Sequence, residues 1–298
     1  MDKQTYDEIT RAMEDTNTLW SNLKSELLYS NRFFPTSSGI LLKVKKIFER
    51  CACTIGGDEK IYFRAREYAV DPKGEFILSS EGMSEKVKHP PRSLIEGFFN
   101  LMISANEATP QSKKAIERYI EKMLGDKIQK SEWGYSKEES GRPPSELTGT
   151  SRASPRYISY LYLASDVNTA LAETRAQIGQ LFSVAQYTIT KELDVVDLSI
   201  ASFDEEDFGS EDFFLFLNMN RTFSTPIYSD DRDYIISQFI AEYIKSMGYD
   251  GVLFDSSRNK GGFNYTLFDD VACEFIRSEL YKAENITIAS NKVFPFEA

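Results

Sequence analysis

The stretch that decides the fold is Tyr160-Leu161-Tyr162-Leu163-Ala164-Ser165-Asp166-Val167-Asn168-Thr169-Ala170-Leu171-Ala172-Glu173. Its first half completes the apolar run from Ile158 to Leu163, which is short and contains two tyrosines and therefore predicts a β-strand. Its second half begins a helix that we predict near Val167 to Gln177. The stretch thus carries a tyrosine in a strand and, eleven residues later, a glutamate in the helix that follows.

Around this unit the sequence predicts further short strands and one more helix. The helix, at Tyr234 to Met247, has apolar residues on one face at three- and four-residue spacing. Strands and helices do not alternate strictly, which indicates an α+β fold. The other predicted strands are Ile61 to Arg66, Phe182 to Ile189, Val195 to Leu198, Gly251 to Asp255, Phe263 to Phe268 and Ile286 to Ala289.

Helical periodicity marks two further regions. Residues 5–52 predict two helices that are interrupted at Phe34-Pro35-Thr36-Ser37, and residues 92–124 predict a helical pair inserted between strands. We therefore divide the chain into an N-terminal helical segment, residues 1–55, and a main domain, residues 56–298, with a helical insertion at about 75–130.

The composition is that of a soluble globular protein of 298 residues with a formal net charge of −11. Because Lys and Arg hold nucleic acids mainly through phosphates, this charge argues against a nucleic-acid surface, and an anionic substrate would need a local cluster of arginines. No apolar run approaches the ~20 residues of a membrane span, and the N-terminus lacks a signal-peptide pattern, so we expect a cytoplasmic protein. The acidic run from Asp204 to Asp212 predicts a solvated loop.

Several common kinds of catalytic site are absent from the sequence. It has no glycine-rich dinucleotide fingerprint and no P-loop, and its only histidine, His89, precedes two prolines in a turn-like segment. We therefore expect neither a histidine-based triad nor a metal site. Polar residues do stand at the edges of apolar runs: Arg64, Arg66, Glu173, Ser256 and Ser257. Taken alone, each fits a salt bridge, an exposed helix face or a cap, and the residues by themselves indicate only a soluble α+β domain.

In their order along the chain these residues resemble the RES domain, a family named for its arginine, glutamate and serine. Arg64 in Tyr62-Phe63-Arg64-Ala65-Arg66 resembles the leading arginine, and Arg152 in Ser151-Arg152-Ala153-Ser154-Pro155 resembles a second one, with serines where the family usually has glycine and asparagine. The stretch from Tyr160 to Glu173 is the most specific match. The segment Gly248-Tyr249-Asp250-Gly251-Val252-Leu253-Phe254-Asp255-Ser256-Ser257-Arg258, followed by Asn264, is similar to the family's serine strand. The resemblance covers about residues 60–270.

The resemblance implies an ADP-ribosyltransferase-like core of short mixed strands with flanking helices, and a toxin that depletes NAD⁺ by cleaving the bond between nicotinamide and ribose. It implies that NAD⁺ is the substrate, without a prosthetic group. The catalytic residues would be Glu173, Arg64, Ser256 and Tyr162, with Glu173 stabilising positive charge on the ribose. Arg64 and Arg152 would bind the pyrophosphate, Tyr162 the nicotinamide ring and Ser256 its carboxamide or the ribose, with Arg175 and Asn264 in support.

Three alternatives stay open on the sequence. The acceptor of the ADP-ribosyl group is water or phosphate in the leading hypothesis and a protein side chain in its closest rival. In the third hypothesis a degenerate RES fold binds a nucleotide or a partner without catalysis. The resemblance also implies a cognate antitoxin or another regulator. The N-terminal helices could serve as oligomerisation elements or as a lid within the chain, because their apolar faces must be covered.

Overall fold

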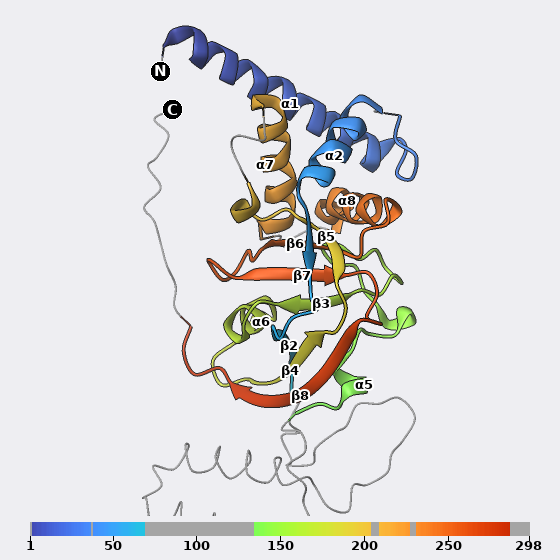
Figure 1. The fold of residues 1–298 in the computed structure, drawn as a ribbon, viewed down its shortest axis with the longest axis vertical. Helices are drawn as coiled ribbons and strands as arrows, with labels where there is room; N and C mark the ends of the chain where they lie inside the picture. The colour runs from blue at the N-terminus through green and yellow to red at the C-terminus, as the bar shows by residue number, and fades with distance from the viewer. Residues whose placement is uncertain (1, 37, 69–133, 204–208, 227–230, 287–298) are drawn as a thin grey trace, which may run out of the picture.

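The computed structural model describes residues 2–36, 38–68, 134–203, 209–226 and 231–286 (Figure 1). Its centre is one eight-stranded sheet with the order β1-β5-β6-β7-β3-β2-β4-β8. The β5–β6 pair is parallel and the other pairs are antiparallel, so the predicted α+β class with a mixed sheet is confirmed. The strands are β1 (Ala52–Ile55), β2 (Tyr62–Glu67), β3 (Leu161–Ala164), β4 (Leu181–Ile189), β5 (Leu193–Asp197), β6 (Gly251–Asp255), β7 (Phe263–Leu267) and β8 (Cys273–Lys282).

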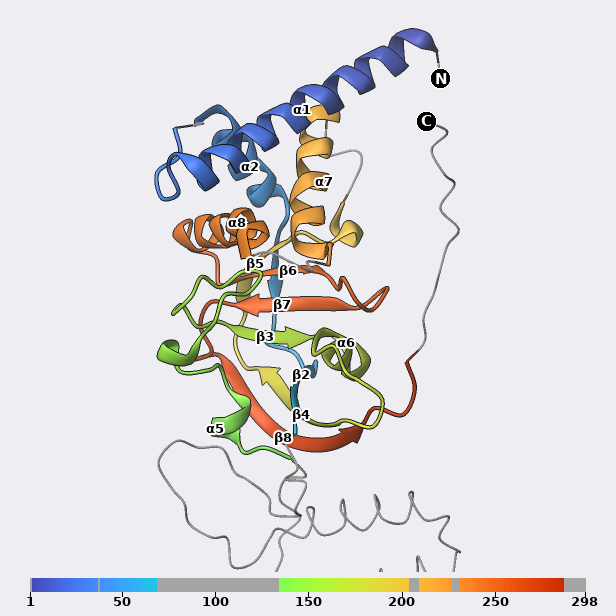
Figure 2. The same ribbon diagram turned by 180° about the vertical axis from the view of Figure 1, so that it is seen from behind.

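The long helices gather at the β1-β5-β6 end of the sheet, and one short helix lies beside β2 and β3, as Figures 1 and 2 both show. The first group is α1 (Lys3–Tyr29), α2 (Ser38–Arg50), α7 (Ser210–Ser224) and α8 (Ile235–Ser246), and the helix beside β2 and β3 is α6 (Val167–Glu173). The other helical turns among the described residues are α5 (Lys137–Ser140), η2 (Ser145–Leu147), η3 (Ile200–Ser202) and η4 (Asp231–Tyr234). Within the described ranges, no helix is both long and apolar enough to cross a membrane.

The first two helices are part of the main hydrophobic core. Trp20 and Leu23 of α1 and Phe48 of α2 are buried with Phe216 of α7 and Ile240 of α8. The strand that follows them, β1, pairs with β5 in the common sheet. The predicted interruption between two N-terminal helices is confirmed, and the division of the chain at residue 55 stays a prediction. In the structure both sides of residue 55 contribute to one sheet and one core.

Two strands and one long helix of the described residues were not predicted, β1, β8 and α7, and neither were the short helical turns α5, η2, η3 and η4. The helix α7 was missed because Phe213, Phe214 and Phe216 place apolar residues around much of its circumference, so no single stripe stands out. The interpretation of Asp204 to Asp212 as a solvated loop is wrong at its end, and residues 204–208 lie outside the described residues. Glu211 and Asp212 lie in the first turn of α7 and form ion pairs with Lys43 and Arg50 of α2.

Some boundaries also differ from prediction. The helix predicted to reach Gln177 ends at Glu173, because Arg175 adopts a left-handed conformation with φ 59°. The last strand of the described residues is β8; of the predicted strand Ile286 to Ala289, Ile286 is outside any strand, and residues 287–289 lie outside the described residues. The predicted insertion at about 75–130 also lies outside the described residues.

Candidate active site

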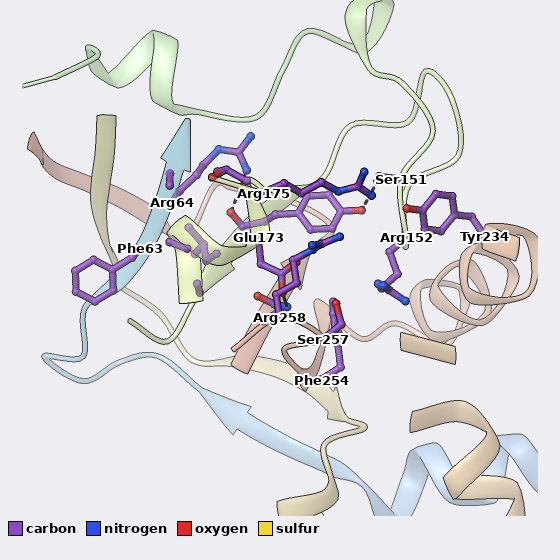
Figure 3. A pocket seen from close by; sticks show the side chains of 17 residues that line it. Phe63, Arg64, Ser151, Arg152, Glu173, Arg175, Tyr234, Phe254, Ser257 and Arg258 are labelled. Atoms are coloured by element: carbon purple, nitrogen blue, oxygen red, sulfur yellow. Dashed lines mark hydrogen bonds between the residues drawn. The ribbon is translucent and has the colours of Figure 1, made fainter. Parts of the chain in front are cut away.

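A cavity of about 320 Å³ opens where the end of β3, the end of β6 and the start of β7 meet, in the middle of the strand order. Asn264 of β7 pairs with Ala164 of β3 and with Phe254 of β6, which brings these three strands together. The volume is within the range of sites for small molecules. The side chains that line it come from these strands, from β2, from the end of α6 and from three loops (Figure 3).

The turn after β6 packs closely against α6. Gly262 lies so near to α6 that a Cβ atom built on it would be 2.0 Å from the Thr169 hydroxyl oxygen. The Asn259 amide donates to the same hydroxyl at 2.8 Å. A larger residue at position 262 would push the turn away, so the glycine fixes the approach of the β6–β7 connection to α6.

This approach brings Glu173, the last residue of α6, to Ser256 and Asn264. One carboxylate oxygen, Oε1, accepts hydrogen bonds from Ser256 Oγ and from Asn264 Nδ2, each at 2.7 Å. Among the described residues, no other donor is bonded to this carboxylate. Glu173 also lines the cavity. The site therefore holds a carboxylate by one oxygen and leaves the other available to a ligand.

The Ser256 hydroxyl has no capacity left for a ligand. It donates to Glu173 and accepts from the backbone N–H groups of Arg258 and Asn259 at 3.1 and 3.0 Å, which uses one donor and both acceptor positions. Its neighbour Ser257 lines the cavity, and Ser256 is not among the lining residues. The structure thus gives Ser256 a positioning contact to Glu173, whereas the sequence interpretation assigned it a contact with the substrate.

Arg64 of β2 lies on the side of the cavity opposite to Arg152 and Tyr234 (Figure 3). Its Nη1 donates to the Tyr162 carbonyl at 3.0 Å, and its buried Nε has no hydrogen-bond partner in the part of the chain that the structure describes. Burial, together with the nearby charge of Arg66, lowers the pKa of Arg64 to about 10, so the guanidinium is still cationic at neutral pH. A buried cationic N–H without an acceptor is uncommon in native proteins and suits the arrival of an anionic group.

Arg152 lines the cavity but already has partners. Its two terminal nitrogens donate to the carbonyls of Thr222 and Thr225, each at 2.8 Å, at the C-terminal end of α7. Cationic groups at this end satisfy free carbonyls and offset the helix dipole. In Figure 3, Arg152 and Tyr234 lie on one side of the cavity, and Phe63 and Arg64 on the other.

Tyr162 organises the loop that carries Arg152. Its hydroxyl lies 2.7 Å from Ser151 Oγ and 2.9 Å from Ser154 Oγ, and it accepts from the Ala153 N–H at 3.2 Å. Burial raises the pKa of Tyr162, so the hydroxyl stays protonated at neutral pH. Tyr162 lines the cavity, and its hydroxyl is hydrogen-bonded to the loop of residues 151–154.

Arg258 and Tyr234 also line the cavity and were not singled out from the sequence. The half-buried Arg258 has no side-chain hydrogen bond or ion pair with any other described residue. Its position at the end of the segment from Gly248 to Arg258 was the signal that could have identified it. Arg175 also lines the cavity and is exposed. The lining as described contains four arginines and one carboxylate, although the whole chain has a net charge of −11.

The fold and the cavity define an α+β domain with a fixed carboxylate and an excess of guanidinium groups. The family model for the RES domain matches residues 126–287, which is more than half of the chain. This protein therefore belongs to the RES domain family. No curated protein and no solved structure matches the chain. Arg64 lies outside the matched residues, but the pairing of β2 with β3 and β4 brings it into the cavity.

Proposed function

We propose that this protein cleaves NAD⁺ at the bond between nicotinamide and ribose, with Glu173 as the catalytic carboxylate. The observation that carries the proposal is the charge distribution of the cavity. One carboxylate with a free oxygen faces a set of guanidinium groups, two of which, Arg64 and Arg258, have unused donors among the described residues. NAD⁺ combines a cationic nicotinamide ribose with a dianionic pyrophosphate, which fits a site of this kind.

In the proposed reaction the bond from the ribose C1′ to the nicotinamide nitrogen breaks, and both of its electrons leave with nicotinamide. The leaving group is neutral, so no general acid is needed. Positive charge then develops on the ribose, and the fixed Glu173 carboxylate stabilises it electrostatically or grips a ribose hydroxyl. An acceptor oxygen bonds to C1′ and loses its proton, which with water gives ADP-ribose, nicotinamide and H⁺.

The arginines would bind the pyrophosphate in the ground state as well as in the transition state. Guanidinium groups form paired hydrogen bonds with phosphate oxygens. Arg64 and Arg258 carry this role in the proposal because their donors are not used up within the protein. Arg152 would contribute its charge from a fixed place at α7, and Arg175 and Tyr162 would complete the binding surface.

Incubation of the purified full chain with NAD⁺, followed by chromatography of the products, tests the proposal. We expect nicotinamide in a 1:1 ratio to the NAD⁺ consumed. Parallel reactions with and without phosphate identify the acceptor as phosphate or water, and alkyne-tagged NAD⁺ reports transfer to protein side chains. Intact NAD⁺ after prolonged incubation with folded protein would contradict the proposal and favour a binding function for the same cavity.

A further inference from the structure

Asp166, the residue that precedes α6, makes more hydrogen bonds than a helix cap needs. One of its carboxylate oxygens, Oδ1, accepts from the Thr169 N–H at 2.9 Å, which is the usual bond of an N-cap. The other oxygen, Oδ2, accepts from the Ser165 hydroxyl at 2.8 Å and from the Thr169 hydroxyl at 2.6 Å. The bonds to Oδ2 leave the cap unchanged, so this oxygen has a separate role.

Both of these hydroxyls also accept a hydrogen bond from the side of β6 and β7. The Ser165 hydroxyl accepts from the N–H of Phe263, the first residue of β7, at 3.0 Å. The Thr169 hydroxyl accepts from the Asn259 amide, in the β6–β7 connection of residues 256–262, at 2.8 Å. A hydroxyl has a single hydrogen, and the Asp166 carboxylate takes it in both cases, so the lone pairs face this connection. Two hydrogen-bond paths thus join one carboxylate oxygen to the β6–β7 connection and its end.

The two paths need a carboxylate at position 166. Serine, threonine and asparagine also cap helices, but none of them has enough acceptor positions to cap and to accept from two further hydroxyls. Burial raises the pKa of Asp166, but hydrogen bonds from Thr169 and Ser165 outweigh burial and lower the pKa below its ordinary value. The carboxylate is therefore charged at neutral pH, and hydrogen bonds to an ionised acceptor are stronger than neutral ones.

The part of the chain that these paths hold also carries the partners of Glu173. Ser256 begins the β6–β7 connection, and its hydroxyl accepts from the Asn259 N–H at 3.0 Å while it donates to Glu173 at 2.7 Å. Asn264, the other donor to Glu173, directly follows Phe263. Both donors to the Glu173 carboxylate are thus next to a residue that is bonded, through a hydroxyl, to Asp166.

We propose that Asp166 is a positioning residue of the active site, whose carboxylate holds the β6–β7 connection against α6 and so places Ser256 and Asn264 at Glu173. Asp166 and Glu173 lie at opposite ends of the same short helix, so the helix and the connection are fixed to each other at both ends. The consequence for catalysis rests on the proposed cleavage of NAD⁺, whereas the anchoring of the connection does not.

Amide hydrogen exchange of the full chain tests the anchoring without NAD⁺. Asp166→Asn keeps a capping side chain but lacks the second carboxylate oxygen, and we expect residues 256–263 to exchange about tenfold faster than in wild type. The matched control is Asp2→Asn, because Asp2 caps α1 through the Thr5 N–H at 2.8 Å, and this variant should leave exchange at residues 256–263 unaltered. Unchanged exchange in a folded Asp166→Asn protein would overturn the proposal.

Thr169→Val is a second variant that keeps the Asp166 carboxylate and removes one of the two hydroxyls. It breaks one path only, so exchange at residues 256–263 should rise by a smaller factor than in Asp166→Asn. Circular dichroism and the melting temperature establish that the variants fold, and Thr169→Val decides the question if Asp166→Asn does not fold. Wild-type exchange in Thr169→Val would then overturn the proposal.

Steady-state release of nicotinamide tests the consequence for catalysis. We expect kcat of Asp166→Asn to fall about tenfold through misplacement of the Glu173 carboxylate, and KM to rise as well because Arg258 lies in the same connection. In the Glu173→Gln background the same change should lower kcat by less than about twofold, since no carboxylate is left to position.

Equal losses of kcat in the two backgrounds would overturn the positioning role, because a loss of folded protein acts on both alike. If folded wild-type protein releases no nicotinamide, the proposed function fails, and hydrogen exchange still decides whether Asp166 holds the β6–β7 connection.

Discussion

The two ends of the cavity are built in different ways. At one end, Glu173 is held by Ser256 and Asn264, and the serine is itself held by two backbone N–H groups, so the carboxylate is organised before any ligand arrives. At the other end, Arg64 has a buried N–H without an acceptor and Arg258 has no side-chain partner among the described residues. The carboxylate end is thus held in place by hydrogen bonds within the protein, whereas the arginine end has hydrogen-bond donors that no described residue accepts.

This difference separates two tasks that the resemblance alone assigns to one set of residues. A prearranged carboxylate suits stabilisation of charge that appears only in the transition state, since it needs no reorganisation during the reaction. Unused guanidinium donors suit ground-state binding of an anion. Arg152 belongs to neither end in this sense, because its donors hold the last carbonyls of α7. The four predictions that follow test this division.

The largest effect is expected for Glu173→Gln, which keeps the size of the side chain and removes its charge. Turnover of NAD⁺ should fall roughly a hundredfold or more, as for a lost electrostatic contact of about 3 kcal/mol, while KM changes little. Steady-state kinetics of nicotinamide release measure both values. The same change at the exposed Glu146 of η2 serves as the control and should be silent. Near-normal turnover in a folded Glu173→Gln protein would remove Glu173 from the catalytic role.

Arg152→Ala should reduce the stability of the protein. The change removes two charge-assisted hydrogen bonds at the C-terminal end of α7, so the free energy of unfolding should fall by roughly 2 kcal/mol. Urea denaturation followed by circular dichroism measures the change. Arg258→Ala, at a residue without such partners, is the comparison and should unfold at nearly the wild-type urea concentration. Equal stability of wild type and Arg152→Ala would show that α7 does not depend on this cap.

Arg258→Ala should instead weaken substrate binding. We expect KM for NAD⁺ to rise about tenfold, equivalent to ~1.4 kcal/mol, with little change in kcat, because phosphate contacts exist before and during bond cleavage. Arg156→Ala is a suitable control, since Arg156 is exposed and does not line this cavity. If the two variants had the same KM, Arg258 would have no part in binding.

The smallest effect is expected for Ser256→Ala, because Asn264 still holds the Glu173 carboxylate. The change removes all three hydrogen bonds of the Ser256 hydroxyl, of which one reaches the carboxylate; the loss of that bond, about 1 kcal/mol, should lower kcat roughly fivefold and leave KM nearly unchanged. Ser257→Ala, at the neighbouring residue on the cavity wall, should affect KM rather than kcat. If Ser256→Ala changed KM and Ser257→Ala changed kcat, Ser256 would contact the substrate, as the sequence interpretation proposes.

Much of the fold was predictable from local patterns. The strands β4, β6 and β7 were predicted to within one residue, because each is a bounded apolar run. The helix α7 was not, because its apolar residues surround the helix axis instead of forming one stripe. The sequence could therefore not predict that Arg152 caps α7, because the helix itself was not predicted.

The site was predictable in its residue types and less so in its contacts. The resemblance named Glu173, Ser256 and Asn264, which the structure joins through one carboxylate oxygen. It could not show that Ser257 and Arg258 line the cavity while Ser256 lies behind it. The chain turns sharply after β6, and the alternation that assigns faces along a strand does not extend into a turn.

Isothermal titration of NAD⁺ into the Glu173→Gln protein tests the division between the two ends most directly, because slow turnover lets binding be measured with little cleavage of NAD⁺. We expect Glu173→Gln to bind NAD⁺, and the further change Arg64→Ala to raise the dissociation constant at least tenfold, by about 1.4 kcal/mol. Equal affinity of the single and double variants would contradict the division of tasks between the two ends, since Arg64 would then contribute nothing to binding.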